Sequence, residues 1–162
     1  PKHGFARNRA WRVVDASAPD RITLTFADDT ATRALWPHAF EAELAVVLAA
    51  DTLAITLTVT NTRDAPLSFT AALHTYLAVS SIAQARVHGL AGARCLDATR
   101  GLAPGVEASA AVCFDGEFDR VYPAVDGELV VEDGTTRIVI AREGFAGAVV
   151  WNPGAEKAAA LS

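Results

Sequence analysis

The strongest constraint on the fold is a regular alternation of apolar and polar residues over positions 53–59. Every second residue there is Leu, Ile or Val, and the residues between are mostly threonine. A period of two predicts a β-strand with one buried face. Residues 42–48 also have strand character, and only Ala50-Asp51 separates the central parts of the two segments, so we expect them to pair as a hairpin. The expected inward-facing set is Leu53, Ile55, Leu57 and Val59.

Two further patterns indicate antiparallel strands. Residues 21–26 alternate in the same way, and the polar run Asp28-Asp29-Thr30 should end that strand. Residues 128–132 face residues 136–140 across Asp133-Gly134, a dipeptide that favours a tight hairpin turn. These segments predict half-buried strands joined by short turns.

The rest of the chain adds turns rather than helices. Residues 61–66 form a turn cluster, and residues 101–107, with Pro104 and Gly105, are typical of a surface loop. Helical periodicity is weak, and no repeat of fixed period occurs. We therefore predict an all-β fold, an antiparallel β-sandwich, formed as a single domain over residues 1–162.

Composition narrows the classes of function. The chain has 162 residues, of which 51% are hydrophobic, and a net charge of −5 with scattered basic residues. This excludes the basic surface of a nucleic-acid-binding protein, and no apolar run is long enough for a membrane span or a signal peptide, which predicts a cytoplasmic protein. Cys95 and Cys113 have no metal-ligand spacing, so we expect reduced core thiols and no zinc site.

One histidine lies inside an apolar segment with strand character, residues 69–79. Alternation would place His74 and Tyr76 on one face and Leu73, Thr75 and Leu77 on the other. A face of small and hydrogen-bonding residues fits a ligand-facing sheet surface, and it fits a solvent-facing strand equally well. A histidine in a strand is more often structural than catalytic.

A set of short motifs, taken in order, resembles one enzyme family. The resemblance is to the hexose-6-phosphate mutarotases (glucose-6-phosphate 1-epimerases) of the aldose 1-epimerase superfamily, and it extends over the whole chain. It implies a galactose-mutarotase-like β-supersandwich and an isomerase that interconverts the α and β anomers of a phosphorylated hexose. The motifs are Pro1–Trp11, Trp36–Phe40, Ala72–Tyr76, Val87–Leu90, Asp119–Tyr122 and Val150–Gly154 followed by Glu156-Lys157.

Anomer exchange needs one acid at the ring oxygen and one base at the anomeric hydroxyl, and it needs no metal or organic cofactor. The resemblance implies that His74 is the general acid, which suits a group that titrates near neutrality. It also implies that Asp119 binds sugar hydroxyls. Taken alone, Asp119 would more often cap a turn or pair with Arg120.

The resemblance assigns the substrate phosphate to Arg7, whose forked guanidinium suits a phosphate group. Without the resemblance, Arg7 would be a solvated surface charge. His3 matches a family residue near the sugar pocket. Trp36 and Trp151 favour packing and turn roles, although aromatic faces also stack on sugars, and His88 is expected to be structural.

Two features of the family have no counterpart here. They are the general-base Glu, which Glu156 and Glu143 do not match, and an Arg in an upstream Arg-Gly-Gly segment. We therefore expect part of a mutarotase, with low activity and a homo-oligomeric state formed through exposed sheet edges. Two alternatives stay open: a non-catalytic carbohydrate-binding β-sandwich and a purely structural domain.

Overall fold

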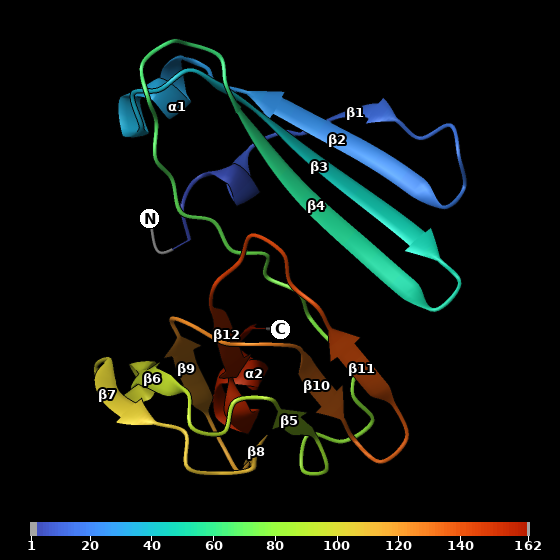
Figure 1. Cartoon of the computed structure of the whole chain (residues 1–162), viewed down its shortest axis with the longest axis vertical. Coiled ribbons are helices and arrows are strands. Elements are labelled where there is room, and N and C mark those ends of the chain that lie inside the picture. Colours follow the sequence, from blue (N-terminus) through green and yellow to red (C-terminus); the bar gives the residue numbers. More distant parts are fainter. Residues whose placement is uncertain (1–2, 162) are drawn as a thin grey trace. The chain divides into compact units, whose positions relative to one another are not determined.

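The computed structural model describes residues 3–161, and the chain divides into two compact units, Pro1–Ala71 and Ala72–Ser162. Each unit is built from antiparallel strands, and the described residues form three four-stranded sheets (Figure 1). The prediction of an all-β antiparallel fold is confirmed. Pro1 and Lys2, which begin the first of the family motifs, lie outside the described residues.

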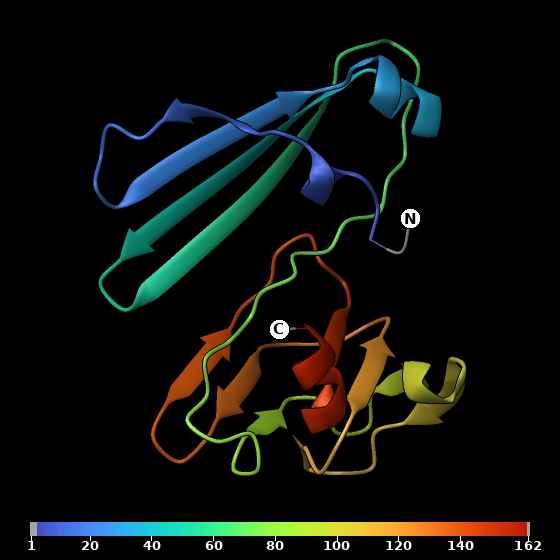
Figure 2. The same ribbon diagram turned by 180° about the vertical axis from the view of Figure 1, so that it is seen from behind.

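The first unit contains one sheet with the strand order β1-β2-β3-β4. Its strands are β1 (Arg12–Asp15), β2 (Arg21–Ala27), β3 (Phe40–Ala49) and β4 (Thr52–Asn61), accompanied by the 3-10 helix η1 (Ala6–Asn8) and the helix α1 (Thr30–Leu35). The long hairpin of β3 and β4 forms one side of the sheet, as Figure 2 shows in teal and green.

The expected hairpin of residues 42–59 is confirmed, with Leu44 facing Leu57 and Val46 facing Ile55 across the two strands. Ile55, Leu57 and Val59 are half-buried, as the alternation predicts. Leu53 is an exception: it is 56% exposed, because it lies at the far end of the hairpin beside Leu48, which is 55% exposed.

An aromatic cluster packs the other end of this sheet. The ring of Phe40 lies 5.4 Å from Phe26 and 5.2 Å from Trp36, so Trp36 has the packing role that the sequence favoured. Helix α1 begins at a capping box, in which the Asp29 carboxylate accepts from the Thr32 amide and the Thr32 hydroxyl accepts from the Asp29 amide. This short helix was not predicted from the sequence, because it covers fewer than two turns.

The second unit is a sandwich of two sheets. One has the order β11-β10-β5-β8 and the other the order β12-β9-β6-β7. Both contribute to one buried core, which includes Val87, Val112 and Leu129 from the first sheet and Cys95 and Tyr122 from the second. The first sheet consists of β5 (Arg86–His88), β8 (Ala111–Cys113), β10 (Leu129–Glu132) and β11 (Arg137–Ile140).

The second sheet of this sandwich holds the strands that position the candidate site. They are β6 (Arg94–Asp97), β7 (Ala103–Val106), β9 (Phe118–Tyr122) and β12 (Ala148–Asn152), with the 3-10 helix η2 (Ala98–Arg100) after β6 and the helix α2 (Gly154–Leu161) after β12. The Asp133-Gly134 hairpin is also confirmed, since β10 and β11 pair antiparallel across it.

Residues 101–107 were expected to form a surface loop, and that prediction is wrong. They contain β7, which pairs with β6, and they end at Glu107, which is only 4% exposed. Pro104 misled the prediction because it cannot donate a ladder hydrogen bond. At a sheet edge that loss costs nothing, since β7 pairs only with β6 among the described strands.

The two cysteines are free thiols, but only Cys95 is a core residue. Cys113 is exposed, so the expectation of a second core thiol is wrong. The reason is the alternation in the short strand β8, where Val112 points into the core and its neighbours therefore point outward.

Residues 69–79 form no hydrogen-bonded strand, so that prediction is also wrong. Figure 2 shows this segment as a green coil. A strand exists only by pairing, and within residues 3–161 no strand forms a ladder with this segment. The alternation nevertheless survives in its C-terminal half, where Leu77 and Val79 pack against the core of the second unit.

Candidate functional site

Three ring side chains of the second unit, those of His74, Tyr76 and Trp151, meet at one surface. The His74 ring stacks on Tyr76 at a centroid distance of 4.9 Å and meets the edge of Trp151 at 5.9 Å. Tyr76 and Trp151 are also in edge contact, at 6.3 Å, and Tyr76 is 78% exposed. The three rings therefore form an accessible surface, called here the aromatic platform.

The segment that carries His74 and Tyr76 is anchored at its C-terminal end. Leu77 and Val79 pack against the core, which leaves His74 and Tyr76 on the alternate positions. Immediately after them, the Ser80 amide donates to the buried Asp133 carboxylate in the β10–β11 turn. Hydrogen bonds from backbone amides, that of Ser80 foremost, hold the pKa of Asp133 far below its usual range.

The third ring is held by the turn that follows β12. Directly after Trp151, the Asn152 side chain donates to the Gly116 carbonyl at 2.8 Å. Gly154 then approaches the backbone so closely that a Cβ there would lie 2.8 Å from the Glu117 nitrogen. The Trp-Asn-Pro-Gly sequence thus makes the turn that was expected, and the same turn fixes Trp151 beside His74.

Asp119 lies directly opposite Trp151 in the β9–β12 ladder. Facing residues of an antiparallel pair project to the same side of the sheet, so Asp119 lies beside Trp151 on the side where Trp151 meets the His74 ring. Val121 and Val149 face each other one step further along this same side, and Val149 is 57% exposed. The structure thus brings His74 and Asp119 to Trp151 from two separate segments.

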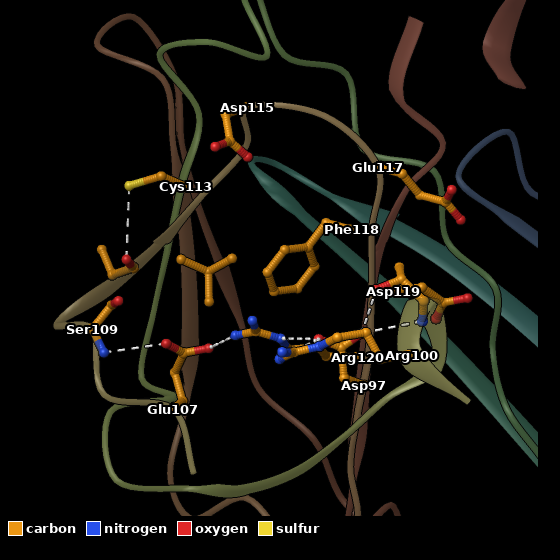
Figure 3. Close-up of a pocket in the computed structure, with 13 residues that line it drawn as sticks. Asp97, Arg100, Glu107, Ser109, Cys113, Asp115, Glu117, Phe118, Asp119 and Arg120 are labelled. Atoms are coloured by element: carbon orange, nitrogen blue, oxygen red, sulfur yellow. Dashed lines mark hydrogen bonds and ion pairs between the residues drawn. The ribbon is translucent and has the colours of Figure 1, made fainter. Parts of the chain in front are cut away.

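The neighbouring residue, Arg120, points to the other side of β9. Its guanidinium lies between Glu107, at 2.6 Å, and Asp97, at 3.5 Å (Figure 3). The ion pairs of Arg120 within residues 3–161 therefore go to these two carboxylates and not to Asp119. The Glu107 carboxylate also accepts from the Tyr122 hydroxyl at 3.0 Å, and Tyr122 is fully buried.

This network shifts the pKa values of its members. Burial alone would raise the pKa of Glu107, but hydrogen bonds from the Ser109 amide, Tyr122 and Arg120 outweigh burial and hold it below its ordinary value. Burial and the adjacent Glu107 carboxylate raise the pKa of Tyr122. The network therefore keeps Glu107 ionised and Tyr122 neutral at physiological pH.

A cavity of about 350 Å³ opens beside this network and is bordered by Phe118, Asp119 and Arg120. Its innermost charged groups, Glu107 and Arg120, are paired with each other, which is the arrangement of a structural network. Residues 3–161 contain no group of three His, Cys, Asp or Glu side chains placed to hold a metal ion.

The remaining predicted site residues belong to the first unit. Arg7 lies in η1 and is exposed, and His3 is exposed in the turn before it. The structure therefore places His74 and Asp119 around one surface and describes Arg7 and His3 in a separate compact unit. His88 contacts Glu132 across β5 and β10, with 3.0 Å between Nε2 and Oε1, in agreement with a structural role.

Sequence reasoning missed the part that Trp151 plays at this surface and missed the Glu107–Arg120 network. The signal for Trp151 was present in the alternation of β9 and β12, but its use required the register that sets Trp151 against Asp119. The signal for Glu107 was hidden in the segment that was expected to be a loop.

Comparison with known proteins shows to which family the chain is similar. The chain matches the family description "Aldose 1-epimerase" over residues 1–162. It is 35% identical over 173 aligned residues to a protein of Cenchrus ciliaris and 33% identical over 159 residues to one of Salmonella typhimurium, both named "Putative glucose-6-phosphate 1-epimerase". These alignments cover 99% and 95% of this chain, but 53% and 52% of the relatives, so the chain spans about half their length.

A solved structure agrees with both sequence matches. The crystal structure described as "a putative mutarotase (YeaD)" from Salmonella typhimurium superimposes with a TM-score of 0.83 at 31% identity. It covers 99% of this chain and 54% of that protein. The described part of the chain contains no helix long and apolar enough to cross a membrane.

Proposed function

Because this chain belongs to the aldose 1-epimerase family, we propose that the protein interconverts the α and β anomers of a hexose 6-phosphate such as glucose 6-phosphate. The observation that supports this most is the meeting of His74 and Asp119 at Trp151. A proton donor, a hydroxyl-binding carboxylate and an aromatic face together provide what a pyranose ring requires.

His74 acts as the general acid in this proposal. It gives its proton to the ring oxygen while the anomeric hydroxyl loses its proton to a base, and the bond between the anomeric carbon and the ring oxygen breaks. The anomeric carbon becomes an aldehyde and rotates, and the freed sugar hydroxyl attacks it again. That hydroxyl gives its proton back to His74, and the protonated base returns its proton to the carbonyl oxygen, which becomes the new anomeric hydroxyl. Electrons and protons balance without a cofactor.

Asp119 and the platform position the sugar. The Asp119 carboxylate accepts hydrogen bonds from sugar hydroxyls, and Trp151 packs against the apolar face of the ring. Tyr76 stacks on His74 and limits the orientations of the imidazole, so that its proton is directed at one atom of the substrate.

The family resemblance assigns the substrate phosphate to Arg7 and a sugar contact to His3. The test for Arg7 uses a pair of ligands: Arg7→Ala should weaken the binding of glucose 6-phosphate and leave the weaker binding of glucose unchanged. Arg63→Ala is the matched control, because Arg63 is another exposed arginine of the first unit. Equal losses for both sugars would contradict the phosphate role.

We assign no general base among the 162 residues, because no glutamate in the sequence matches the family position. An acid without its base forgoes about a hundredfold or more of the rate. This chain should therefore exchange anomers more slowly than a complete acid–base pair would, and yet faster than buffer alone.

The test is anomer exchange of glucose 6-phosphate, followed by NMR saturation transfer, with wild type and His74→Asn. We expect wild type to accelerate exchange and His74→Asn to lose about a hundredfold of that acceleration, while the dissociation constant changes little. Undiminished acceleration by the variant would remove His74 from the mechanism.

The aromatic platform also favours a second candidate, a non-catalytic carbohydrate-binding module. An exposed Tyr76 beside Trp151 is a stacking surface whether or not His74 transfers a proton. The same experiment separates the two functions, because the module would bind the sugar and leave the exchange rate at its value in buffer.

A further inference from the structure

The edges of the three sheets differ sharply. The described residues form six edge strands, of which β1, β7, β8, β11 and β12 are each no longer than five residues. The register of β1 shifts between Val13 and Asp15, and β7 contains Pro104. Short length, irregular register and proline are the devices by which proteins keep a sheet edge from pairing with other chains.

The sixth edge, β4, has none of these devices. It has ten residues, and its ladder with β3 is regular from Ala49–Thr52 to Phe40–Asn61. The strand contains no charged residue, proline or glycine. Four threonines and Ala54 alternate with the apolar residues Leu53, Ile55, Leu57 and Val59, and Asn61 ends the strand. Within residues 3–161, β4 pairs with β3 alone.

We infer that the outer edge of β4 pairs antiparallel with β4 of a second copy of this chain, about a two-fold axis at Thr56. This places β-branched or aliphatic side chains opposite one another on one face and small or threonine side chains opposite one another on the other. The facing pairs are Thr52 with Thr60, Leu53 with Val59, Ala54 with Thr58, and Ile55 with Leu57.

The alternation of β4 selects this register. Facing residues of an antiparallel pair lie on the same side of the sheet, so a shift by one residue would set the apolar face of one copy beside the threonine face of the other. Two neighbouring registers also keep the faces together: one centred on Leu57, which would set Leu53 against Asn61, and one centred on Ile55, which pairs only residues 52–58 of β4. The register at Thr56 gives the longest matched run, because it pairs residues 52–60 and leaves Asn61 outside.

The second strand from the edge is compatible with this pairing. Glu41 and Glu43 of β3 face Thr60 and Thr58, and in the paired dimer these rows continue into Thr52 and Ala54 of the second copy. No charged residue then lies beside another of the same sign. The edge amides and carbonyls of β4, which alternate along any edge strand, find partners in the other copy.

The test uses charges at the two-fold axis. Thr56→Lys places two ammonium groups opposite each other in a dimer, and Thr56→Glu places two carboxylates there. Sedimentation velocity on the 162-residue chain should show a dimer for wild type, and each variant should dissociate about fivefold more readily or worse. An equimolar mixture of the two variants should recover the dimer, because the axis then holds a Lys–Glu pair.

Thr62→Lys is the matched control, because this exposed threonine lies just beyond β4. It adds the same charge outside the paired segment and should leave the dimer intact. A Thr56 variant could lose its sheet structure, which circular dichroism would detect. In that case hydrogen exchange of the wild-type chain tests the dimer instead: the protection of the β4 amides should rise with protein concentration.

Three results would overturn the inference. A wild-type chain that stays monomeric over about a hundredfold range of concentration, with β4 protection independent of concentration, would show that the edge has no second copy. If Thr56→Lys and Thr56→Glu both dimerised as readily as wild type, the interface would lie elsewhere. A mixture that fails to recover the dimer would exclude the two-fold register at Thr56.

Discussion

Asp119 and Arg120 are neighbours on β9, yet their surroundings are opposite in kind. Arg120 faces a network of two carboxylates and a buried tyrosine, in which every charge is paired. Asp119 faces the side on which Trp151 meets His74. Alternation in a single strand thus separates a residue that holds the scaffold together from one that adjoins the proposed site.

The same contrast explains why the proposed site is centred on Trp151 and not on the cavity beside Arg120, although Asp119 borders that cavity as well. Electrostatic pairing on the Arg120 side satisfies the charged groups internally, so little of their interaction remains for a ligand. On the Asp119 side, apolar and aromatic surface stays exposed, with Val149 at 57% and Tyr76 at 78%. Exposed aromatic surface beside a carboxylate suits a sugar better than a paired ionic cluster does.

The largest expected effect is a loss of stability when the ion-pair network on the Arg120 side of β9 is disrupted. Arg120→Leu leaves the buried Glu107 carboxylate without its cation, so the free energy of unfolding should fall by about 3 kcal/mol in urea titrations. Arg100→Leu is the control: Arg100 also contacts Asp97, but its side chain is 71% exposed, and its loss should cost less than about 1 kcal/mol. Equal losses in the two variants would mean that the buried network is not structural.

The next effect concerns binding on the other side of β9. Asp119→Asn should weaken the binding of glucose 6-phosphate about tenfold in calorimetry, because a charged hydrogen-bond acceptor is lost. Its urea midpoint should stay at the wild-type value. A variant that loses stability while keeping its affinity would reverse the roles that we assign to the two faces.

A smaller effect tests the aromatic platform. Trp151→Ala should weaken the binding of the same sugar by about threefold to tenfold, since an aromatic contact contributes about 0.5–1.5 kcal/mol beyond burial. Trp151→Phe should retain most of the affinity. Trp36→Ala is the matched control in the first unit, where Trp36 packs on Phe40, and a similar loss of affinity there would argue against a specific platform.

The smallest effect is a dependence of stability on pH. The folded state holds the pKa of Glu107 below its ordinary value, so the ionised carboxylate stabilises the fold above that ordinary value, and this stabilisation is lost as the pH falls through the folded pKa. The stability gap between wild type and Glu107→Gln should therefore narrow below about pH 4. If the difference in the free energy of unfolding between the two proteins stayed constant down to about pH 3, Glu107 would not be ionised in the folded state.

Local patterns in the sequence predicted much of the fold. The period of two in β2 and β4 and the Asp133-Gly134 turn correctly indicated antiparallel hairpins, since both signals depend only on nearby residues. Residues 69–79 have the same local pattern and form no strand, because pairing depends on a neighbour that the pattern cannot reveal. The same limit applied to β7, where the edge position of Pro104 permits a strand.

The candidate site was also predictable only in part from the sequence. The pairing of His74 with Tyr76 followed from alternation, and the structure shows their rings stacked. Their contact with Trp151, and the position of Asp119 across from it, depend on the register of β9 and β12. Register between distant strands is a tertiary property, so the sequence could name these residues through a resemblance but could not bring them together.

The most direct test of this account is an NMR titration of the 162-residue chain with glucose 6-phosphate. We predict that the Trp151 indole N–H and the His74 ring shift along one saturating curve, while the core residues Tyr122 and Val112 stay unchanged. Trp151→Phe identifies the indole signal. Shifts centred on Arg120 and Phe118 at the cavity, with Trp151 and His74 unmoved, would show that the ligand binds on the scaffold side of β9 and would contradict the account.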